Sequence, residues 1–231
     1  MTGVWVAAVA GAVLVVGASG RLLLSSPRAA RRHPRRAVIE RLSDATSVDP
    51  ATGAVTSVQA ADLTIEADAL DAIWTPGDLE RLARTYWRFL TRVTLGLIRV
   101  HYTEGERSVV LLLRPFRLLT FQAPEYEMSA TCGLVRWRIA RGLLVARRGR
   151  NGGGYLQIEV VRDAGRDAAH ARLHVEVEVA NFYPAIASGI SLRLYNITQS
   201  RIHVSITHGF LRSLTRLDLA ESRVGRLATG P

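Results

Sequence analysis

Residues 171–182, ARLHVEVEVANF, alternate apolar and polar side chains, and this alternation constrains the fold more than any other feature of the chain. In an extended chain the two sets point to opposite sides: Leu173, Val175, Val177 and Val179 against His174, Glu176 and Glu178. Shorter runs from residue 97 onward also approach a period of two, with turn signals such as Gly152–Gly154 between them. The pattern predicts an antiparallel sheet with one apolar face that other elements must cover.

Two segments with helical spacing are available to cover that face. The first contains WTPGDLERLARTYWRFL, in which Thr75 is the expected N-cap and Pro76 the first helical residue. Its apolar positions recur every three or four residues: Leu79, Leu82, Ala83, Tyr86, Leu90, Val93 and Leu97. After Pro184 the helical period returns and predicts one long or broken C-terminal helix, although residues 201–208, RIHVSITH, also alternate as a strand would.

The N-terminal segment is apolar and directly precedes a cluster of arginines. Residues 3–20 carry no charge, and a membrane-spanning helix needs about 20 such residues. A cleaved signal peptide is the alternative, but no basic residue precedes the run. Six arginines come before the first acid: Arg21, Arg28, Arg31, Arg32, Arg35 and Arg36. Because basic flanks stay in the cytoplasm, we expect a single-pass cell-membrane anchor with its N-terminus outside and the arginines at the anionic inner surface.

Composition divides the chain into three parts. Residues 1–24 are the expected transmembrane anchor, residues 25–72 a basic juxtamembrane arm and an acidic linker, and residues 73–231 a single α+β domain. Residues 63–67 of the linker, LTIEA, could instead form a first strand of that domain. The net charge is +10, but the chain contains no lysine, so its arginines reflect the GC-rich genome of a bacterium as well as any basic function. Gly3, Ala7 and Gly11 share one face of the anchor and are a candidate homodimer contact.

The order of a helix, antiparallel strands and a C-terminal helix over residues 58–220 resembles the START-like helix-grip superfamily of polyketide cyclases and lipid-transfer proteins. Proteins of that superfamily wrap a curved antiparallel sheet around a long C-terminal helix and leave a hydrophobic cavity between the two. The resemblance therefore implies a helix-grip-like fold and a hydrophobic ligand, such as a lipid or an isoprenoid, between the sheet and the C-terminal helix.

The polar face of the expected sheet supplies the candidate ligand-binding side chains. They are Arg136, Arg138, Glu159, His174, Glu176 and Glu178. If this face lines a cavity, these groups would bind the polar end of an anionic or hydroxylated ligand. The alternative is a ladder of cross-strand charge pairs without a ligand. A metal site is not expected, because the Cα atoms of His174, Glu176 and Glu178 spread along about 13 Å of strand.

Other motifs argue against several kinds of activity. Gly152–Gly154 precede a strand rather than a helix, which favours a hairpin turn over a phosphate-binding loop. Cys132 has no indicated histidine base, so we assign no catalytic residue and expect no cofactor. The sequence shows no recognition helix or exposed stacking aromatics, so a nucleic-acid partner is not expected.

These features leave three functional hypotheses. The first is a membrane-anchored domain that binds a hydrophobic small molecule, with membrane lipids as its other partner. The second is a non-catalytic scaffold whose basic surface docks a protein or an anionic membrane. The third is a cyclase or hydratase that would use Arg136, Glu159, Glu176 or His174 as polar groups in the cavity.

Overall fold

The computed structural model describes residues 37–111, 116–150, 152–163, 169–185, 201–216 and Leu219. The expected anchor, with Gly3, Ala7 and Gly11, lies outside the described residues, as do the six arginines that follow it. No helix in the described part of the chain is both long and apolar enough to span a bilayer.

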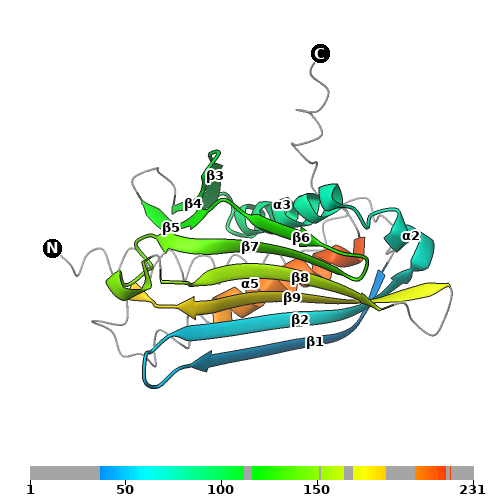
Figure 1. Ribbon diagram of the computed structural model, residues 1–231, viewed down its shortest axis with the longest axis horizontal. Helices are drawn as coiled ribbons and strands as arrows, with labels where there is room; N and C mark the ends of the chain where they lie inside the picture. Colours follow the sequence, from blue (N-terminus) through cyan, green and yellow to red (C-terminus); the bar gives the residue numbers. More distant parts are fainter. Residues whose placement is uncertain are drawn as a thin grey trace, which may run out of the picture.

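The described strands form one antiparallel sheet (Figure 1). Their bounds are β1 Ala37–Val48, β2 Val55–Glu66, β3 Ile98–Tyr102, β4 Glu106–Leu111, β5 Arg117–Gln122, β6 Glu125–Met128, β7 Cys132–Arg141, β8 Tyr155–Asp163 and β9 His170–Phe182. The strand order is β1-β2-β9-β8-β7-β5-β4-β3, and β6 pairs with β7 beside this path. The antiparallel sheet expected from the alternation between residues 97 and 182 is therefore confirmed.

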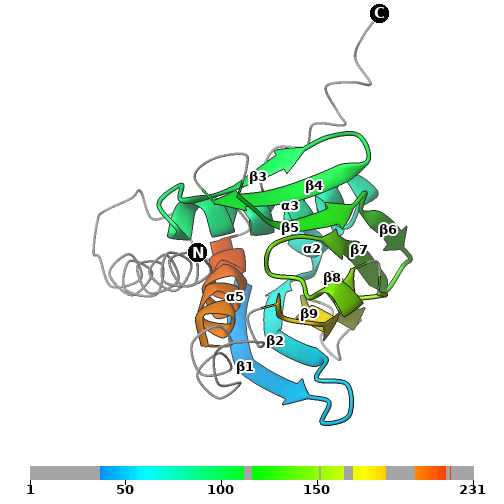
Figure 2. The same cartoon turned by 90° about the vertical axis from the view of Figure 1, so that its left-hand side faces the viewer.

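The helices lie on one face of this sheet. They are α2 Ala67–Asp71, α3 Pro76–Val93 and α5 Arg201–Ser213, with short 3-10 turns η1 Arg147–Gly149 and η4 Leu214–Arg216. Figure 2 shows the sheet curving around α3 and α5, so that they occupy its concave side. The architecture is α+β and helix-grip-like, and residues 201–213 are helical rather than extended.

Local chemistry explains why α3 begins where it does. The Thr75 hydroxyl accepts a hydrogen bond from the backbone N–H of Asp78 at 3.2 Å and donates one to the Asp78 carboxylate at 2.6 Å. Pro76 follows at the first helical position, where its missing N–H is no loss. The expected helix and its N-cap are thus confirmed, and the predicted apolar stripe supplies most of its buried side chains.

The first two strands come from residues that the sequence analysis assigned to the arm and the linker. Residues 37–48 and 55–66 form a hairpin, and β2 pairs with both β1 and β9. The carboxylate of Asp49 holds the turn by accepting from the backbone N–H groups of Ala51 at 2.8 Å and Thr52 at 3.3 Å. Gly53 closes the turn with a φ of 67°, a conformation that glycine adopts without strain. The sheet therefore includes residues 37–48 and 55–66.

Aromatic side chains fill the centre of the concave face. The Trp87 ring of α3 lies 5.2 Å from that of Trp137 on β7 and 5.6 Å from that of Phe121 on β5. Tyr86 meets Phe210 of α5 edge to face at 5.2 Å. This aromatic cluster joins α3, α5 and the sheet into one core.

Candidate ligand-binding site

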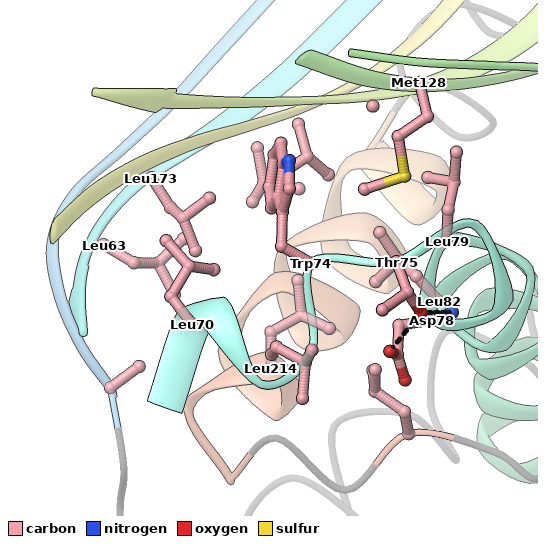
Figure 3. Close-up of a pocket in the computed structure, with 16 residues that line it drawn as sticks. Leu63, Leu70, Trp74, Thr75, Asp78, Leu79, Leu82, Met128, Leu173 and Leu214 are labelled. Atoms are coloured by element: carbon pink, nitrogen blue, oxygen red, sulfur yellow. Dashed lines mark hydrogen bonds between the residues drawn. The ribbon is translucent and has the colours of Figure 1, made fainter. Parts of the chain in front are cut away.

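A pocket lies on the concave face at the end of the sheet where α2 packs (Figure 3). Its volume is about 80 Å³. On the same scale one water molecule needs roughly 10–15 Å³, so the pocket has room for a group of several heavy atoms. It is therefore large enough for a small apolar molecule or the end of a hydrocarbon chain.

The sheet side of the pocket consists of side chains that lie opposite one another on adjacent strands. Val175 of β9 pairs with Val160 of β8, and Val160 pairs with Gly133 of β7. Leu63 of β2 lies directly opposite Leu173 of β9 in the next row. An added Cβ at Gly133 would lie 3.4 Å from Leu79 Cδ1, so the missing side chain at this position leaves part of the space open.

The helical wall is built around the link between α2 and α3. Its apolar members are Leu70, Ile73, Trp74, Leu79, Leu82 and Leu214. The Trp74 indole N–H donates to the backbone carbonyl of Ser129 at 3.0 Å, which fixes the ring at the pocket. The Arg162 guanidinium lies 5.3 Å from the centre of that ring and pairs with Asp71 at 2.7 Å. These contacts tie the link to β8 and to the turn before β7.

The few polar groups of the pocket are already engaged. The Asp78 carboxylate accepts from the Thr75 hydroxyl at 2.6 Å and pairs with Arg81 at 2.8 Å. Both Thr75 and Asp78 belong to the N-terminus of α3, so their interactions stabilise the helix. The arrangement can bind an apolar group, but it presents no free acid and base pair to a reacting bond. No group of three or more metal-ligating side chains occurs among the described residues.

The side chains predicted to bind a ligand all lie on the convex face of the sheet, opposite the pocket. They are Arg136, Arg138, Glu159, His174, Glu176 and Glu178, and none of them lines the pocket. The buried members of the same strands alternate with them and face the helices. Ligand binding by these six residues stays a prediction, and the pocket found here does not involve them.

On the convex face the structure joins these residues into a network between strands. Arg136 Nε donates to Gln157 Oε1 at 2.8 Å, and the Tyr155 hydroxyl donates to Glu178 at 3.0 Å. Arg138 pairs with Glu125 of β6 at 2.7 Å. Of these contacts, the pair of Arg138 and Glu125 is a cross-strand charge pair of the kind that the sequence analysis gave as the alternative, whereas glutamine and tyrosine supply the other partners.

The electrostatics of this face also bear on the lone cysteine. Burial and the neighbouring Glu159 carboxylate raise the pKa of the Cys132 thiol above its usual value. The Cys132 sulfur lies 3.5 Å from Glu159 Oε1. A raised pKa keeps the thiol protonated near neutral pH, which is the opposite of what a cysteine nucleophile needs.

The pair of Asp62 and His174 on this face predicts a dependence of stability on pH. The His174 ring lies 2.6 Å from the Asp62 carboxylate, and this hydrogen bond, with Arg41, lowers the pKa of Asp62 from its ordinary 3.8. A carboxyl group whose pKa is lower in the folded than in the unfolded protein adds stability at pH values above its ordinary pKa. This contribution is lost as the pH falls through the pKa of the folded state. Because Asp62 is 32% exposed, we expect Asp62→Asn to cost less than about 1 kcal/mol at neutral pH.

Urea unfolding followed at several pH values would check this expectation. The difference between the wild type and Asp62→Asn should shrink as the medium becomes acidic. Asp163→Asn is the matched control, because the exposed Asp163 makes no ion pair with another described residue. A difference that grew toward low pH would contradict the assignment.

Two buried polar atoms, Gln59 Oε1 and Trp87 Nε1, have no hydrogen-bond partner among the described residues. Burial raises the pKa of the Tyr86 phenol to about 12, and a hydrogen bond with the Thr207 side chain opposes this rise.

The sequence analysis missed the residues that form the pocket. Leu70, Ile73 and Trp74 precede the recognised helix and were assigned to a linker or to its start. The available signals were a large aromatic directly before an N-cap and a glycine, Gly133, inside an apolar strand. Neither signal indicates a pocket by itself, because only the pairing of the strands places the two segments against each other.

Among known proteins, similarity to this chain was found in solved structures. No family model and no curated protein sequence matches it. The human StAR-related lipid transfer protein 5 is similar over 90% of this chain and 98% of its own, with 8% identity and a TM-score of 0.38. CalU16 from Micromonospora echinospora is similar over 81% of this chain and 79% of its own, with 14% identity and a TM-score of 0.31. At these values no activity transfers to this chain, whose helix-grip-like fold rests on its own strand order and helix placement.

Proposed function

We propose that this chain is a membrane-anchored protein whose domain binds a small apolar ligand, or the end of a lipid or isoprenoid chain, between the sheet, the α2–α3 link and the C-terminal helix. The observation that carries the proposal is the apolar pocket bounded by Leu63, Leu82, Leu173 and Leu214. Its walls come from the α2–α3 link, from the start of α3, from the central strands and from Leu214 in the turn directly after α5.

The apolar wall of the pocket favours an apolar occupant. The fold keeps this space open with a glycine, Gly133, where any larger residue would begin to fill it. A ligand that buries apolar surface there would gain about 25 cal/mol for each Å² of apolar surface removed from water.

The pocket wall also indicates which ligands fit. Apart from Thr75 and Asp78 it offers aliphatic side chains, the Trp74 ring and the Met128 thioether. Methionine adapts its shape to an apolar guest. A hydrocarbon group satisfies such a wall, whereas a charged group would be left without a partner. The volume suits one alkyl or prenyl end rather than a whole two-chain phospholipid.

The position of Ala37, at the start of β1, supports a role at the membrane. Ala37, the first described residue, lines the pocket. Residues 25–36 would connect it to the expected anchor, and an extended segment of that length reaches about 40 Å. The anchor would thus hold the pocket end of the domain near the inner surface of the cell membrane, from which an apolar ligand could enter.

An enzyme of the cyclase or hydratase type has less support. Its proposed polar groups, Arg136, Glu159, Glu176 and His174, lie on the face opposite the pocket. The carboxylate at the pocket, Asp78, is held by the helix cap and by Arg81.

Native mass spectrometry of the full-length chain tests the proposal. The chain would be purified in nanodiscs, released in the gas phase, and examined for a bound molecule that organic extraction then identifies. We expect one apolar molecule bound per chain, with a mass below that of a phospholipid. A folded chain that carries no bound molecule, and that takes up none from added alkyl or prenyl alcohols, would overturn the proposal.

A further inference from the structure

Two leucines stand exposed in turns at one end of the molecule. Leu95, in the turn after α3, is 62% exposed, and Leu143, in the turn after β7, is 54% exposed. Leu95 also has a φ of 54°, a left-handed conformation that is unfavourable for a residue with a branched side chain. This conformation caps α3, because the Leu95 N–H donates to the carbonyl of Arg92 at 3.1 Å and the Gly96 N–H donates to that of Thr91 at 2.8 Å. The cap does not explain why both leucine side chains are exposed, and exposed apolar side chains at one end of a molecule point to a role outside the fold.

Strand pairing places the two leucines at the same end of the sheet. The Leu143 N–H donates to the carbonyl of Arg117 on β5, and Arg117 pairs with Val110 on β4. Val110 pairs in turn with Arg99 on β3, whose guanidinium donates to the carbonyl of the residue after Leu95. Three strand spacings of about 4.8 Å therefore separate Leu143 from Arg99, and Leu95 lies beyond Arg99 in the turn before β3.

Exposed arginines lie on the turns and strand ends at this end of the molecule. They are Arg92, Arg99, Arg117, Arg147, Arg148 and Arg150, of which Arg148 also lies over the Tyr183 ring at 5.0 Å. None of the six forms an ion pair with a carboxylate among the described residues. We call this set, with Leu95 and Leu143, the arginine–leucine end; it is the end toward which the β1 arrow points in Figure 1. The acidic side chains of Glu66, Asp68 and Asp71 lie at the opposite end, where α2 follows β2. Asp49, in the turn after β1, is a carboxylate at the same end as the arginines, and its oxygens accept from Ala51 and Thr52.

We propose that the arginine–leucine end docks on an anionic lipid bilayer. The two leucines would enter the interfacial region, where apolar side chains gain free energy, and the arginines would contact lipid phosphates. Each basic residue near such a surface strengthens binding about fivefold. A nucleic acid would account for the arginines but not for the exposed leucines. This surface is separate from the pocket, so the proposal stands or falls independently of ligand binding.

The length of β1 determines whether the arginine–leucine end can contact the bilayer that holds the expected anchor. The pocket end, where Ala37 enters, and the arginine–leucine end are separated by the length of β1, whose 12 residues span about 40 Å. Residues 25–36 reach the same distance only when fully extended. We therefore expect contact with a second anionic bilayer to be the stronger response.

Environment-sensitive fluorophores at single cysteines test the contact directly. In a Cys132→Ser background, Leu95→Cys and Leu143→Cys would carry the label, and Ala72→Cys at the exposed end of α2 is the matched control. The full-length chain is held in neutral phosphatidylcholine nanodiscs, and vesicles of phosphatidylcholine with about one third phosphatidylglycerol are added. A second arm uses nanodiscs of the anionic mixture alone. We expect a blue shift at positions 95 and 143 in the presence of anionic lipid and none at position 72.

Charge variants test the arginines. Substitution of Arg147, Arg148 and Arg150 together by glutamine should weaken binding of anionic vesicles roughly a hundredfold, and higher salt should weaken it further. The control, Arg41, Arg138 and Arg172 together to glutamine, removes the same charge elsewhere and should have a much smaller effect.

Three results would overturn the proposal. One is the absence of a shift at either leucine position in both anionic arms. Another is an equal shift with neutral vesicles. The third is a response to polyglutamate or duplex DNA without one to anionic vesicles, which would assign the end to an acidic protein or a nucleic acid.

Discussion

Substitution of Gly133 by valine is expected to abolish ligand binding while the domain stays folded. Gly133 faces the pocket from β7, and its Cβ would meet Leu79 at ordinary contact distance, 3.4 Å from Cδ1. Two further methyl groups would then occupy a space of about 80 Å³ that must hold the ligand. Valine is favoured in strands, and we expect the free energy of unfolding to change by less than about 1.5 kcal/mol.

Native mass spectrometry of the variant in nanodiscs would measure the loss, which we expect to be at least about tenfold in occupancy or affinity. Gly105→Val is the matched control. Gly105 lies in the turn between β3 and β4, where an added Cβ meets no atom within 4 Å. Full occupancy in a folded Gly133→Val protein would mean that the ligand binds elsewhere, even if the wild type carries one.

Substitution of Trp137 by alanine is expected to cause the largest loss of stability. Trp137 is 1% exposed and its ring meets that of Trp87 at 5.2 Å, so β7 and α3 depend on each other through this contact. Removal of a buried tryptophan side chain costs about 3–5 kcal/mol through lost apolar burial and the cavity that remains. Since many domains are stable by only about 5–15 kcal/mol, a large part of the chain would unfold at moderate urea concentrations.

Urea unfolding followed by far-UV circular dichroism would measure this loss. Tyr126→Ala is the control, because Tyr126 is an aromatic residue on β6 that is 43% exposed, and it should cost less than about 1 kcal/mol. Equal losses in the two variants would contradict the assignment of the aromatic cluster as the centre of the core.

Elements whose signals are local could be predicted from the sequence. The start of α3 depends on Thr75, Pro76 and Asp78, which interact with one another within one turn. The strands from residue 97 onward reveal themselves by alternation because one side of each must be apolar. These rules need no knowledge of the partners, so helix and strands appeared where they were expected.

The hairpin of β1 and β2 shows where local signals fail. Residues 37–66 contain many small and polar residues, and β1 is exposed along most of its length. Alanine and threonine become strand residues here because β2 lies between β1 and β9 and exchanges backbone hydrogen bonds with both. Such pairing joins residues more than a hundred positions apart, so no window of sequence contains it.

The sequence by itself determined the apolar and polar faces of each strand, the cap and stripe of α3, and the helical period near the C-terminus, because those features depend on neighbours in the chain. It also yields the prediction of an N-terminal anchor, which rests on composition alone. Only the tertiary structure decided which partners meet. It placed Glu176 and His174 on the open convex face, and it set Gly133 opposite Leu79 so that space remained between them. The physical reason is that a pocket is defined by the distance between walls, and here those walls come from segments that only the pairing of the sheet brings together.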